Sequence, residues 1–371
     1  MRTTIYAIVT NDLHHDQRMH RICSSMQDAG YDVTLVGRKK KKSPDILTMP
    51  FDQHRLACYF QNGWLFYLEY NLRVLRMLLS IRPAIIYSVD ADTLLATGIY
   101  KRWSDCKMIF DSHEWYIESP EIHDRKLIKY VWNTVENIFI PNADICFTIN
   151  ESIAKKYEAR YQKQFTVLYN VGKLTPQKVQ GIADKNPYIL YQGVLNKGRG
   201  LESLLMAMED IHDVQLMICG EGDISTSLRN IAHQSHAKDR IKFLGWQSED
   251  QLMALTRDAT LGINLLDAVS KSYYYSLANK FFDYMHAGVP SVNMDFPEYR
   301  NIISKYEVGF LIQDLKKDTI VKAINQALAD QPRLINMKNN CISASQMYQW
   351  QKEESKLKEA LAKLNPVTDC P

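Results

Sequence analysis

Apolar positions recur along the chain in short blocks, and longer amphipathic stretches separate these blocks. In the first half the blocks are β-rich runs such as TIYAIVT, YDVTLVG, PAIIYSV, KMIFDSH and DICFTIN. Stretches with helical spacing lie between them, for example HDQRMHRICSSMQDAG, which ends at Gly30. Because the short runs are apolar on both faces, they predict parallel strands covered by helices on both sides of a sheet.

The alternation stops at the polar stretch GKLTPQKVQGIADKNP and restarts with YILYQG, VQLMICG, IKFLGW, LGINLL, PSVNM and VGFLI. We therefore expect two Rossmann-like, doubly wound α/β domains in tandem, residues 1–172 and 188–345, joined by a linker at 173–187. The helical stretch within 346–371 is long enough to cross back to the first domain. Parallel sheets bind ligands at the carboxyl ends of their strands, so two such sheets are expected to face a central cleft that suits a nucleotide diphosphate.

Composition narrows the class of protein. A net charge of +3 over 371 residues is too small to indicate a nucleic-acid partner. Seven scattered cysteines without a C-x-x-C pair argue against a disulfide framework or a zinc site and favour a reducing compartment. The N-terminus enters a strand at once, which predicts no signal peptide, and we expect a cytoplasmic protein.

One basic run stands out, Arg38 through Lys42. It is either a solvated loop or a surface that meets anionic lipid head groups or an acidic substrate. The apolar stretch WLFYLEYNLRVLRMLLS carries Glu69, Arg73 and Arg76 and is too charged for a spanning helix. It either packs on the sheet or, with the basic run, contacts a membrane surface from the cytoplasmic side.

Two glycine-bearing turns in the second half are candidates for a phosphate site. In YQGVLNKGRGLESLL, Gly193 opens the turn and Arg199 stands near a helix start, where side chain, backbone N–H groups and helix dipole can act together on phosphate. In LMICGEGD, Gly222 permits a close backbone approach to a ligand, and a plain turn explains it nearly as well. Trp246, at the end of the next strand, either flanks a nucleobase or packs.

The stretch SLANKFFDYMHAGVPSV predicts a short helix with one polar face. Asn279 and Asp283 share this face at i, i+4 spacing, while aromatic residues cover the other side. Asp283 could accept hydrogen bonds from the vicinal diol of a ribose, and Lys280 with the helix N-terminus could meet phosphate. Taken alone, a solvated helix face is the simpler interpretation.

In order along the chain, YQGVLNKGRGLESLL, LMICGEGD, IKFLGW and SLANKFFDYMHAGVPSVNMD resemble the family 4 glycosyltransferases of the GT-B fold, of the kind that builds bacterial surface polysaccharides. The last segment is similar to the family's P-N-K-x-x-E-Y-M-x-x-G-x-P-V block, with Asp283 in place of the ribose-binding glutamate. The first half is similar as well, in DQRMHRICSSMQDAGYDVTLV and MIFDSHEW. The chain departs from the family at Tyr275, which replaces a frequent glutamate, at Val194, which replaces a frequent arginine, and at NDLHHD, which replaces a Gly-Gly loop.

The resemblance implies roles for single residues. It places at His113, just after a first-domain strand, the histidine that contacts the donor sugar; without the family, a structural loop histidine is the simpler interpretation. Arg199 and Lys280 would act on the leaving diphosphate, and Asp283, Asn279, Gly222, Trp246 and Gly193 would hold the nucleotide. The pair Asp90-x-Asp92 suggests a metal site of the single-domain GT-A design. The tandem layout contradicts that design, so we expect a helix N-cap at one of the two acids and no metal.

The resemblance implies a retaining, metal-independent glycosyltransferase that moves a sugar from a nucleotide diphosphate-sugar to a glycan or lipid-linked acceptor. Two alternatives remain open at this point, a sugar-nucleotide epimerase of the same fold and a non-catalytic partner subunit. The replacement by Tyr275 favours the second of these. The donor sugar, its base and the acceptor are not encoded in any pattern of the sequence.

Overall fold

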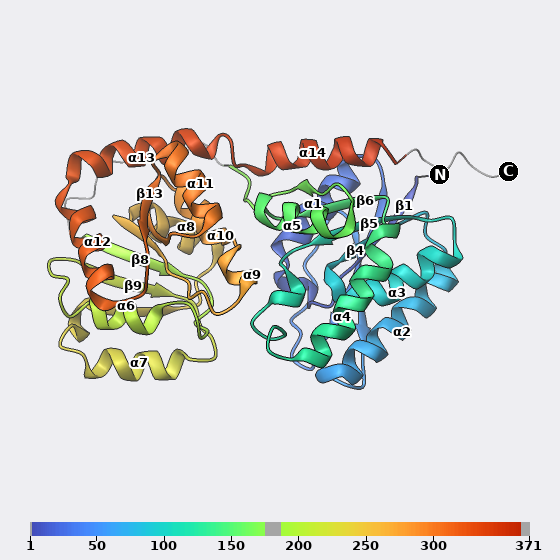
Figure 1. Cartoon of the computed structure of the whole chain (residues 1–371), viewed down its shortest axis with the longest axis horizontal. Helices are drawn as coiled ribbons and strands as arrows, with labels where there is room; N and C mark the ends of the chain where they lie inside the picture. The colour runs from blue at the N-terminus through green and yellow to red at the C-terminus, as the bar shows by residue number, and fades with distance from the viewer. Residues whose placement is uncertain (1, 175–186, 365–371) are drawn as a thin grey trace. The chain divides into compact units, whose positions relative to one another are not determined.

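The computed structural model describes residues 2–174 and 187–364, which divide into two compact units (Figure 1). Unit 1 comprises Met1–Asn170 and Lys352–Pro371, and unit 2 comprises Val171–Gln351. The linker expected at 173–187 falls mainly on residues 175–186, which lie outside the described residues. Each unit is a parallel sheet with helices packed on it, as the alternating pattern predicts.

Unit 1 is built on a seven-stranded sheet with the order β3-β2-β1-β4-β5-β6-β7, in which every recorded pairing is parallel. Its strands are β1 (Thr4–Ile8), β2 (Asp32–Lys39), β3 (Asp52–Ala57), β4 (Ile85–Val89), β5 (Lys107–Ser112), β6 (Ile145–Thr148) and β7 (Thr166–Val167). Its helices are α1 (Gln17–Asp28), α2 (Gly63–Ile81), α3 (Asp90–Trp103), α4 (Lys126–Phe139), α5 (Glu151–Tyr161) and most of α14 (Trp350–Ala362), with short 3₁₀ turns η1 (Leu13–His15), η2 (Tyr116–Glu118) and η3 (Ile140–Asn142).

Local sequence explains how these elements begin and end. Every residue of β4, IIYSV, is buried, as a strand covered on both faces requires. Helix α1 starts where the carboxylate of Asp16 accepts the Met19 N–H at 3.1 Å, and the chain leaves it at Gly30, whose φ of 94° suits glycine.

The expected C-terminal helix is α14, and its residues from Lys352 onward group with unit 1. Leu357 and Leu361 are buried there, and Glu353 accepts the Tyr169 N–H at 3.0 Å. Residues 352–364 therefore complete the core of the first unit.

Strand β3 is a strand that the sequence pattern did not predict. Its residues, DQHRLA, are mostly polar and only partly buried, because β3 is an edge strand that pairs with β2 alone. An edge strand with one neighbour needs no continuous apolar run, which is the signal that identified the others.

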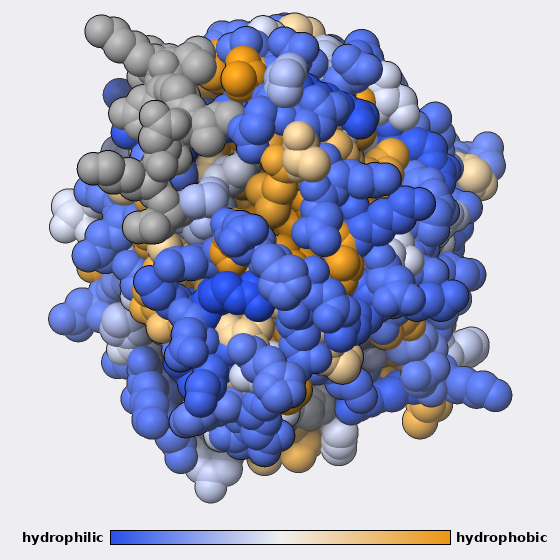
Figure 2. All heavy atoms as spheres, turned by 90° about the vertical axis from the view of Figure 1, so that its left-hand side faces the viewer, coloured by the Kyte–Doolittle hydropathy of each residue, from blue (hydrophilic) through white to orange (hydrophobic). Residues whose placement is uncertain are grey.

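Unit 2 has a six-stranded parallel sheet with the order β10-β9-β8-β11-β12-β13. Its strands are β8 (Tyr188–Gln192), β9 (Gln215–Cys219), β10 (Ile241–Gly245), β11 (Leu261–Asn264), β12 (Ser291–Met294) and β13 (Gly309–Ile312). Its helices are α6 (Leu201–Ala207), α7 (Ser225–Gln234), α8 (Glu249–Asp258), α9 (Lys271–Tyr274), α10 (Asn279–His286), α11 (Pro297–Tyr306), α12 (Lys317–Ala329) and α13 (Gln331–Ser345), with the turn η4 (Lys238–Arg240). Figure 2 shows one outer face of the molecule, which is largely hydrophilic with an apolar strip near its middle.

The helices of both units can be compared with the length and hydropathy of membrane spans. Within residues 2–174 and 187–364, no helix combines the length and the apolar character that crossing a bilayer requires.

Candidate active site

The candidate donor site of unit 2 lies at the carboxyl edge of its sheet, where the segments after β8, β9 and β11 meet. The Gly193 N–H donates to the Cys219 carbonyl at 3.0 Å, which joins the ends of β8 and β9. The Asp267 N–H donates to the Gly198 carbonyl at 2.9 Å, which joins the segments after β11 and β8. Hydrogen bonds between backbones thus hold these turns against one another.

These turns require glycine because their backbones lie too close together for a side chain to fit between them. Gly220 has a φ of 127°, and a Cβ there would lie 2.1 Å from the Gly193 carbonyl oxygen. A Cβ at Gly222 would lie 2.5 Å from the Leu195 carbonyl oxygen. The neighbouring turn accounts for both glycines, and a ligand contact at Gly222 stays a prediction.

Lys280, the second residue of α10, is buried against the end of β8. Its ammonium lies 3.7 Å from the centroid of the Tyr191 ring, and a Cβ at Gly193 would be 3.3 Å from its Nζ. Burial, and then the nearby cation of Arg199, hold the pKa of Lys280 well below its ordinary value, while Asp283 opposes this shift. A lysine in this position gains more from an anionic ligand than a solvated lysine does.

Arg199 supplies a second cation beside Lys280. Its guanidinium carbon lies 5.1 Å from the centroid of the Tyr273 ring, and its buried Nε has no hydrogen-bond partner. In the described part of the chain, neither Arg199 nor Lys280 forms an ion pair with a carboxylate. Two neighbouring cations that make no direct ion pair, with only Asp283 near enough to act on Lys280, are the composition of an anion site.

The polar face of α10 is oriented as the sequence predicts. Asn279 and Asp283 are exposed on this helix, whereas its aromatic side packs into the core through Phe281, Phe282 and Met285. Gln192 Nε2 donates to Asp283 Oδ2 at 2.9 Å, and Gln192 Oε1 accepts from Thr256 at 2.7 Å. Gln192 therefore fixes the rotamer of the carboxylate. Sequence reasoning missed it, although the YQG triplet places this residue directly before Gly193.

Trp246 lies apart from this group. It follows β10, the edge strand two positions from β8 in the sheet, and is 71% exposed. Tyr275, the residue that follows α9, is half-buried. The structure thus brings together Gly193, Arg199, Lys280 and Asp283, and it leaves Trp246 at the margin.

In unit 1, His113 follows β5 at the carboxyl edge of the sheet. Its Nε2 lies 2.9 Å from Asp111 Oδ2. Asp111 is also paired with Arg18 at 2.9 Å and accepts the Tyr87 hydroxyl at 2.7 Å. Burial alone would raise the pKa of Asp111, but Arg18 and His113 hold it far below its usual value. Because an ionised carboxylate can only accept, the Nε2–H of the ring donates the hydrogen bond to Asp111.

Asp90 and Asp92 do not have the expected N-cap role. The N-cap of α3 is Val89, and no side chain caps the helix there. Asp90 has a φ of 55°, and its Oδ1 accepts the His113 N–H at 2.8 Å. Asp92 Oδ2 accepts the Thr10 hydroxyl at 2.5 Å, and burial raises the pKa of Asp92 to about 7. Both acids form tertiary contacts that no local pattern encodes, and Asp90 holds the backbone of His113.

Two family models match almost the whole described chain. The model described as glycosyltransferase family 4 matches residues 16–171, and the model described as glycosyl transferases group 1 matches residues 173–346.

Two curated relatives match about half of the chain. An uncharacterized glycosyltransferase of Methanocaldococcus jannaschii is 28% identical over 43% of this chain and 40% of its own length. A lipopolysaccharide core biosynthesis glycosyltransferase of Rhizobium meliloti is 24% identical over 51% of this chain and 54% of its own length. The chain thus spans about half the length of the curated relatives it matches.

Solved structures share the fold over nearly their full lengths. Sucrose-phosphate synthase from Thermosynechococcus elongatus superposes with a TM-score of 0.80 at 17% identity, covering 98% of this chain and 99% of that chain. HepE from Anabaena, solved in complex with UDP-glucose, superposes with a TM-score of 0.75 at 15% identity, covering 98% of this chain and 100% of that chain. At these identities the likeness concerns the fold, and it confirms the GT-B architecture.

Proposed function

Because the chain belongs to the group 1 and family 4 glycosyltransferases, we propose that it transfers a sugar from a nucleoside diphosphate-sugar to a glycan or lipid-linked acceptor with retention of configuration. The observation that carries this proposal is the pair of cations Arg199 and Lys280 beside the carboxylate of Asp283. Two cations suit a diphosphate, and a fixed, exposed carboxylate suits the ribose diol.

Unit 2 binds the donor in this proposal. Asp283 accepts hydrogen bonds from the ribose hydroxyls, and Asn279 on the same face assists. Lys280, Arg199 and the N-terminal N–H groups of α10 neutralise the charge that grows on the leaving diphosphate. The N-cap of α10, Ala278, has no side chain that could occupy those N–H groups.

His113 acts on the donor sugar in this proposal. Its Nε2 is engaged by Asp111, and its backbone N–H is held by Asp90. A ring fixed in this way can offer Nδ1 to a sugar hydroxyl with little loss of rotamer freedom. No divalent metal is needed, because the cations already neutralise the diphosphate. Activity that survives EDTA supports this point, and activity that EDTA abolishes and Mn²⁺ restores contradicts it.

The first prediction tests the nucleotide end of the site. Asp283→Ala removes a carboxylate that would accept charge-assisted hydrogen bonds from ribose, so binding of a nucleoside diphosphate should weaken by about 2–4 kcal/mol. Isothermal titration calorimetry measures this change, and Glu359→Ala, which removes an exposed carboxylate from α14, is the matched control. UDP and UDP-glucose are the first ligands to titrate. Unchanged affinity in Asp283→Ala contradicts the assignment.

The second prediction tests the sugar end. His113→Ala should lower turnover by about a hundredfold, because misplacing a reacting group costs on that scale. Nucleotide affinity should stay normal, since the nucleotide contacts belong to unit 2. An enzyme that converts the nucleotide-sugar without any acceptor would be an epimerase. A chain that binds no nucleotide diphosphate at all would be a partner subunit.

A further inference from the structure

Two helices of unit 1 carry apolar side chains on faces that none of the unit's described residues covers. Helix α2 buries one side through Phe66, Tyr70, Val74 and Leu78. Its outer side presents a second apolar stripe, Trp64, Leu68, Leu72 and Leu79, all exposed. A helix that is apolar on most of its circumference is normally covered on both sides.

Helix α4 repeats this arrangement. It buries Trp132, Val135 and Phe139, while Leu127, Tyr130, Val131 and Ile138 are exposed. The two helices lie beside α3 on one side of the sheet (Figure 1). The rings of Tyr67 in α2 and Trp132 in α4 are in edge contact, with their centroids 5.4 Å apart. The two outer stripes therefore belong to one helical layer.

The three most exposed members of the stripes, Leu127, Trp64 and Tyr130, stand near the N-terminal ends of their helices. Trp64 is the second residue of α2, the helix that follows strand β3, and Leu127 is the second residue of α4, the α-helix that follows strand β5. A helix that follows a parallel strand starts on the side of the sheet where that strand ends. Tyr59 and Phe60 lie in the loop before α2 and are also exposed. We call Tyr59, Phe60, Trp64, Leu127, Tyr130 and Val131 the aromatic rim.

The rim is held in place despite its exposure. The carboxylate of Glu69 accepts the N–H groups of Tyr59 and Phe60, both at 2.9 Å. Arg38 donates to the Gln61 carbonyl at 3.0 Å, and its guanidinium lies 4.2 Å from the centroid of the Phe66 ring. The basic run at 38–42 therefore starts in contact with the rim loop.

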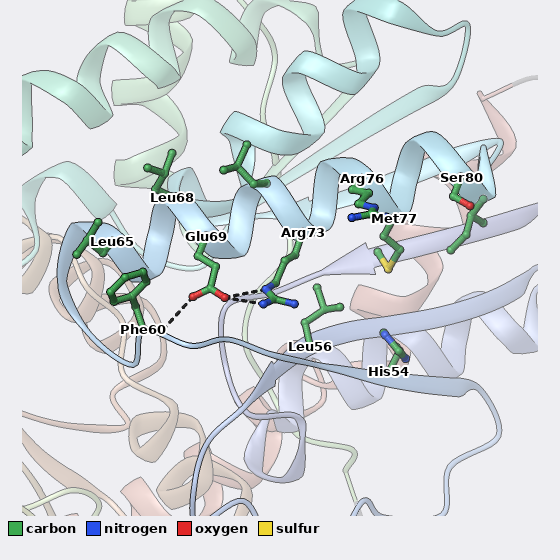
Figure 3. A pocket seen from close by; sticks show the side chains of 12 residues that line it. His54, Leu56, Phe60, Leu65, Leu68, Glu69, Arg73, Arg76, Met77 and Ser80 are labelled. Carbon is green, nitrogen blue, oxygen red and sulfur yellow. Dashed lines mark hydrogen bonds and ion pairs between the residues drawn. The ribbon is translucent and has the colours of Figure 1, made fainter.

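An apolar groove continues from the rim along α2. It runs between α2 and the edge strand β3, has a volume of about 860 Å³, and is lined by Leu56, Leu65, Leu72, Met77, Arg73 and Arg76 among others (Figure 3). Arg73 is paired with Glu69 one turn earlier on α2, at 2.8 Å. The groove thus adds apolar surface with cationic residues at its border.

The charges beside the rim decide between possible occupants. Five consecutive cations, Arg38 through Lys42, and the pair Arg125 and Lys126 adjoin it. The exposed acids near α4 are fewer, Glu121 and Asp124, and Asp124 lies 3.2 Å from His123. A second copy of this chain would bring like charges together, whereas an anionic bilayer attracts these cations. Exposed tryptophan and tyrosine side chains also favour the head-group region of a bilayer.

We propose that the aromatic rim and the basic run dock unit 1 on the surface of an anionic bilayer. The carboxyl edge that bears His113 would then lie next to the membrane, and the acceptor would be a lipid-linked saccharide. The choice of acceptor rests on the proposed function, whereas the docking itself does not.

Flotation of the full chain with vesicles tests this proposal. The protein should float with vesicles of phosphatidylglycerol and phosphatidylcholine at low salt, and little should float with phosphatidylcholine alone. Trp64→Ser combined with Leu127→Ser should lower binding by about tenfold, because both side chains would enter the interface. Lys40→Glu should lower it by at least about fivefold at low salt and by less at high salt.

Trp103→Ser is the matched control. Trp103 is 71% exposed and Trp64 is 70% exposed, but Trp103 ends α3 at the opposite edge of the sheet. It should bind vesicles like the unchanged protein. The proposal is overturned by absent binding to anionic vesicles at low salt, by an equal loss in Trp103→Ser, or by rim variants that convert a dimer to a monomer. Calorimetry with UDP on the same variants should show unchanged affinity. A chain that floats with vesicles but binds no nucleotide contradicts the proposed function and does not contradict the membrane docking.

Discussion

At the scale of single residues, Lys280 combines a cost to stability with a candidate role in binding. The folded protein depresses the pKa of this lysine below its unfolded value, first through burial and then through Arg199. Between the two pKa values the folded state binds fewer protons than the unfolded state, so the free energy of unfolding rises with pH across that window. The stability is lost as the pH falls toward the folded pKa. At neutral pH the protein retains this buried amine at a cost, as residues that serve a ligand often do.

A third prediction follows for Lys280→Met, which keeps the length of the side chain and removes its charge. The ligand-free protein should become more stable by about 1–2 kcal/mol, most clearly at lower pH, because no ammonium is desolvated. Binding of a nucleoside diphosphate should be lost. Thermal unfolding across a pH series and calorimetry measure the two effects, with Lys322→Met, an exposed lysine of α12, as the control. A less stable Lys280→Met protein with intact binding would remove Lys280 from the site.

At the scale of elements, the candidate donor site depends on two turns that touch through their backbones. The segment after β9 lies against the segment after β8 so closely that Gly220 has no room for a side chain. Gly245, which ends β10, also has a positive φ, 65°, but the nearest atom to a Cβ there is 3.5 Å away. A side chain at Gly245 would therefore meet backbone strain alone, whereas a side chain at Gly220 would meet both strain and a steric clash.

The fourth prediction compares their alanine variants. Gly245→Ala should cost about 1 kcal/mol, the strain of a left-handed conformation. Gly220→Ala should cost about 3 kcal/mol or more, because the methyl group would also push the two turns apart. Urea unfolding monitored for unit 2 gives both values. Equal midpoints for the two variants would show that the turns can separate without cost, and the donor site would then be less rigid than the structure indicates.

At the scale of the whole molecule, the chain returns to its first unit after completing the second. Residues from Lys352 onward group with unit 1, where Leu357, Leu361 and Leu364 are buried. Glu353 is buried as well and accepts the Tyr169 N–H near the end of the first segment. Unit 1 is thus assembled from the two ends of the sequence.

The fifth prediction follows from this arrangement. A chain that ends at Gln351 should lose about 5 kcal/mol or more from unit 1, since three buried leucines are removed. Differential scanning calorimetry should show one transition moved to lower temperature. Nucleotide affinity should remain, because the proposed donor contacts all belong to unit 2. If the shortened chain loses nucleotide binding while unit 2 stays folded, the donor site includes residues of unit 1.

The sequence alone determined the fold class, the family and the polar face of α10. Strands β4 and β8 are mostly apolar and buried at every position, and Asn279 and Asp283 stand four residues apart, so local periodicity carries this information. The same reasoning missed β3, because an edge strand shows no such period.

Tertiary structure decided how the candidate residues are held. Gln192 fixes Asp283 from 91 positions away, and Arg18 reaches Asp111 across 93 positions. Asp90 or Asp92 was expected to cap a helix, yet neither does, and the Asp90 carboxylate holds the His113 backbone. A buried carboxylate takes whichever donors the fold brings to it, and parallel strands bring together residues that are distant in sequence. The spacing of apolar residues can therefore be read from the sequence. The hydrogen-bond partner of a buried polar group is decided only when folding places distant strands next to each other.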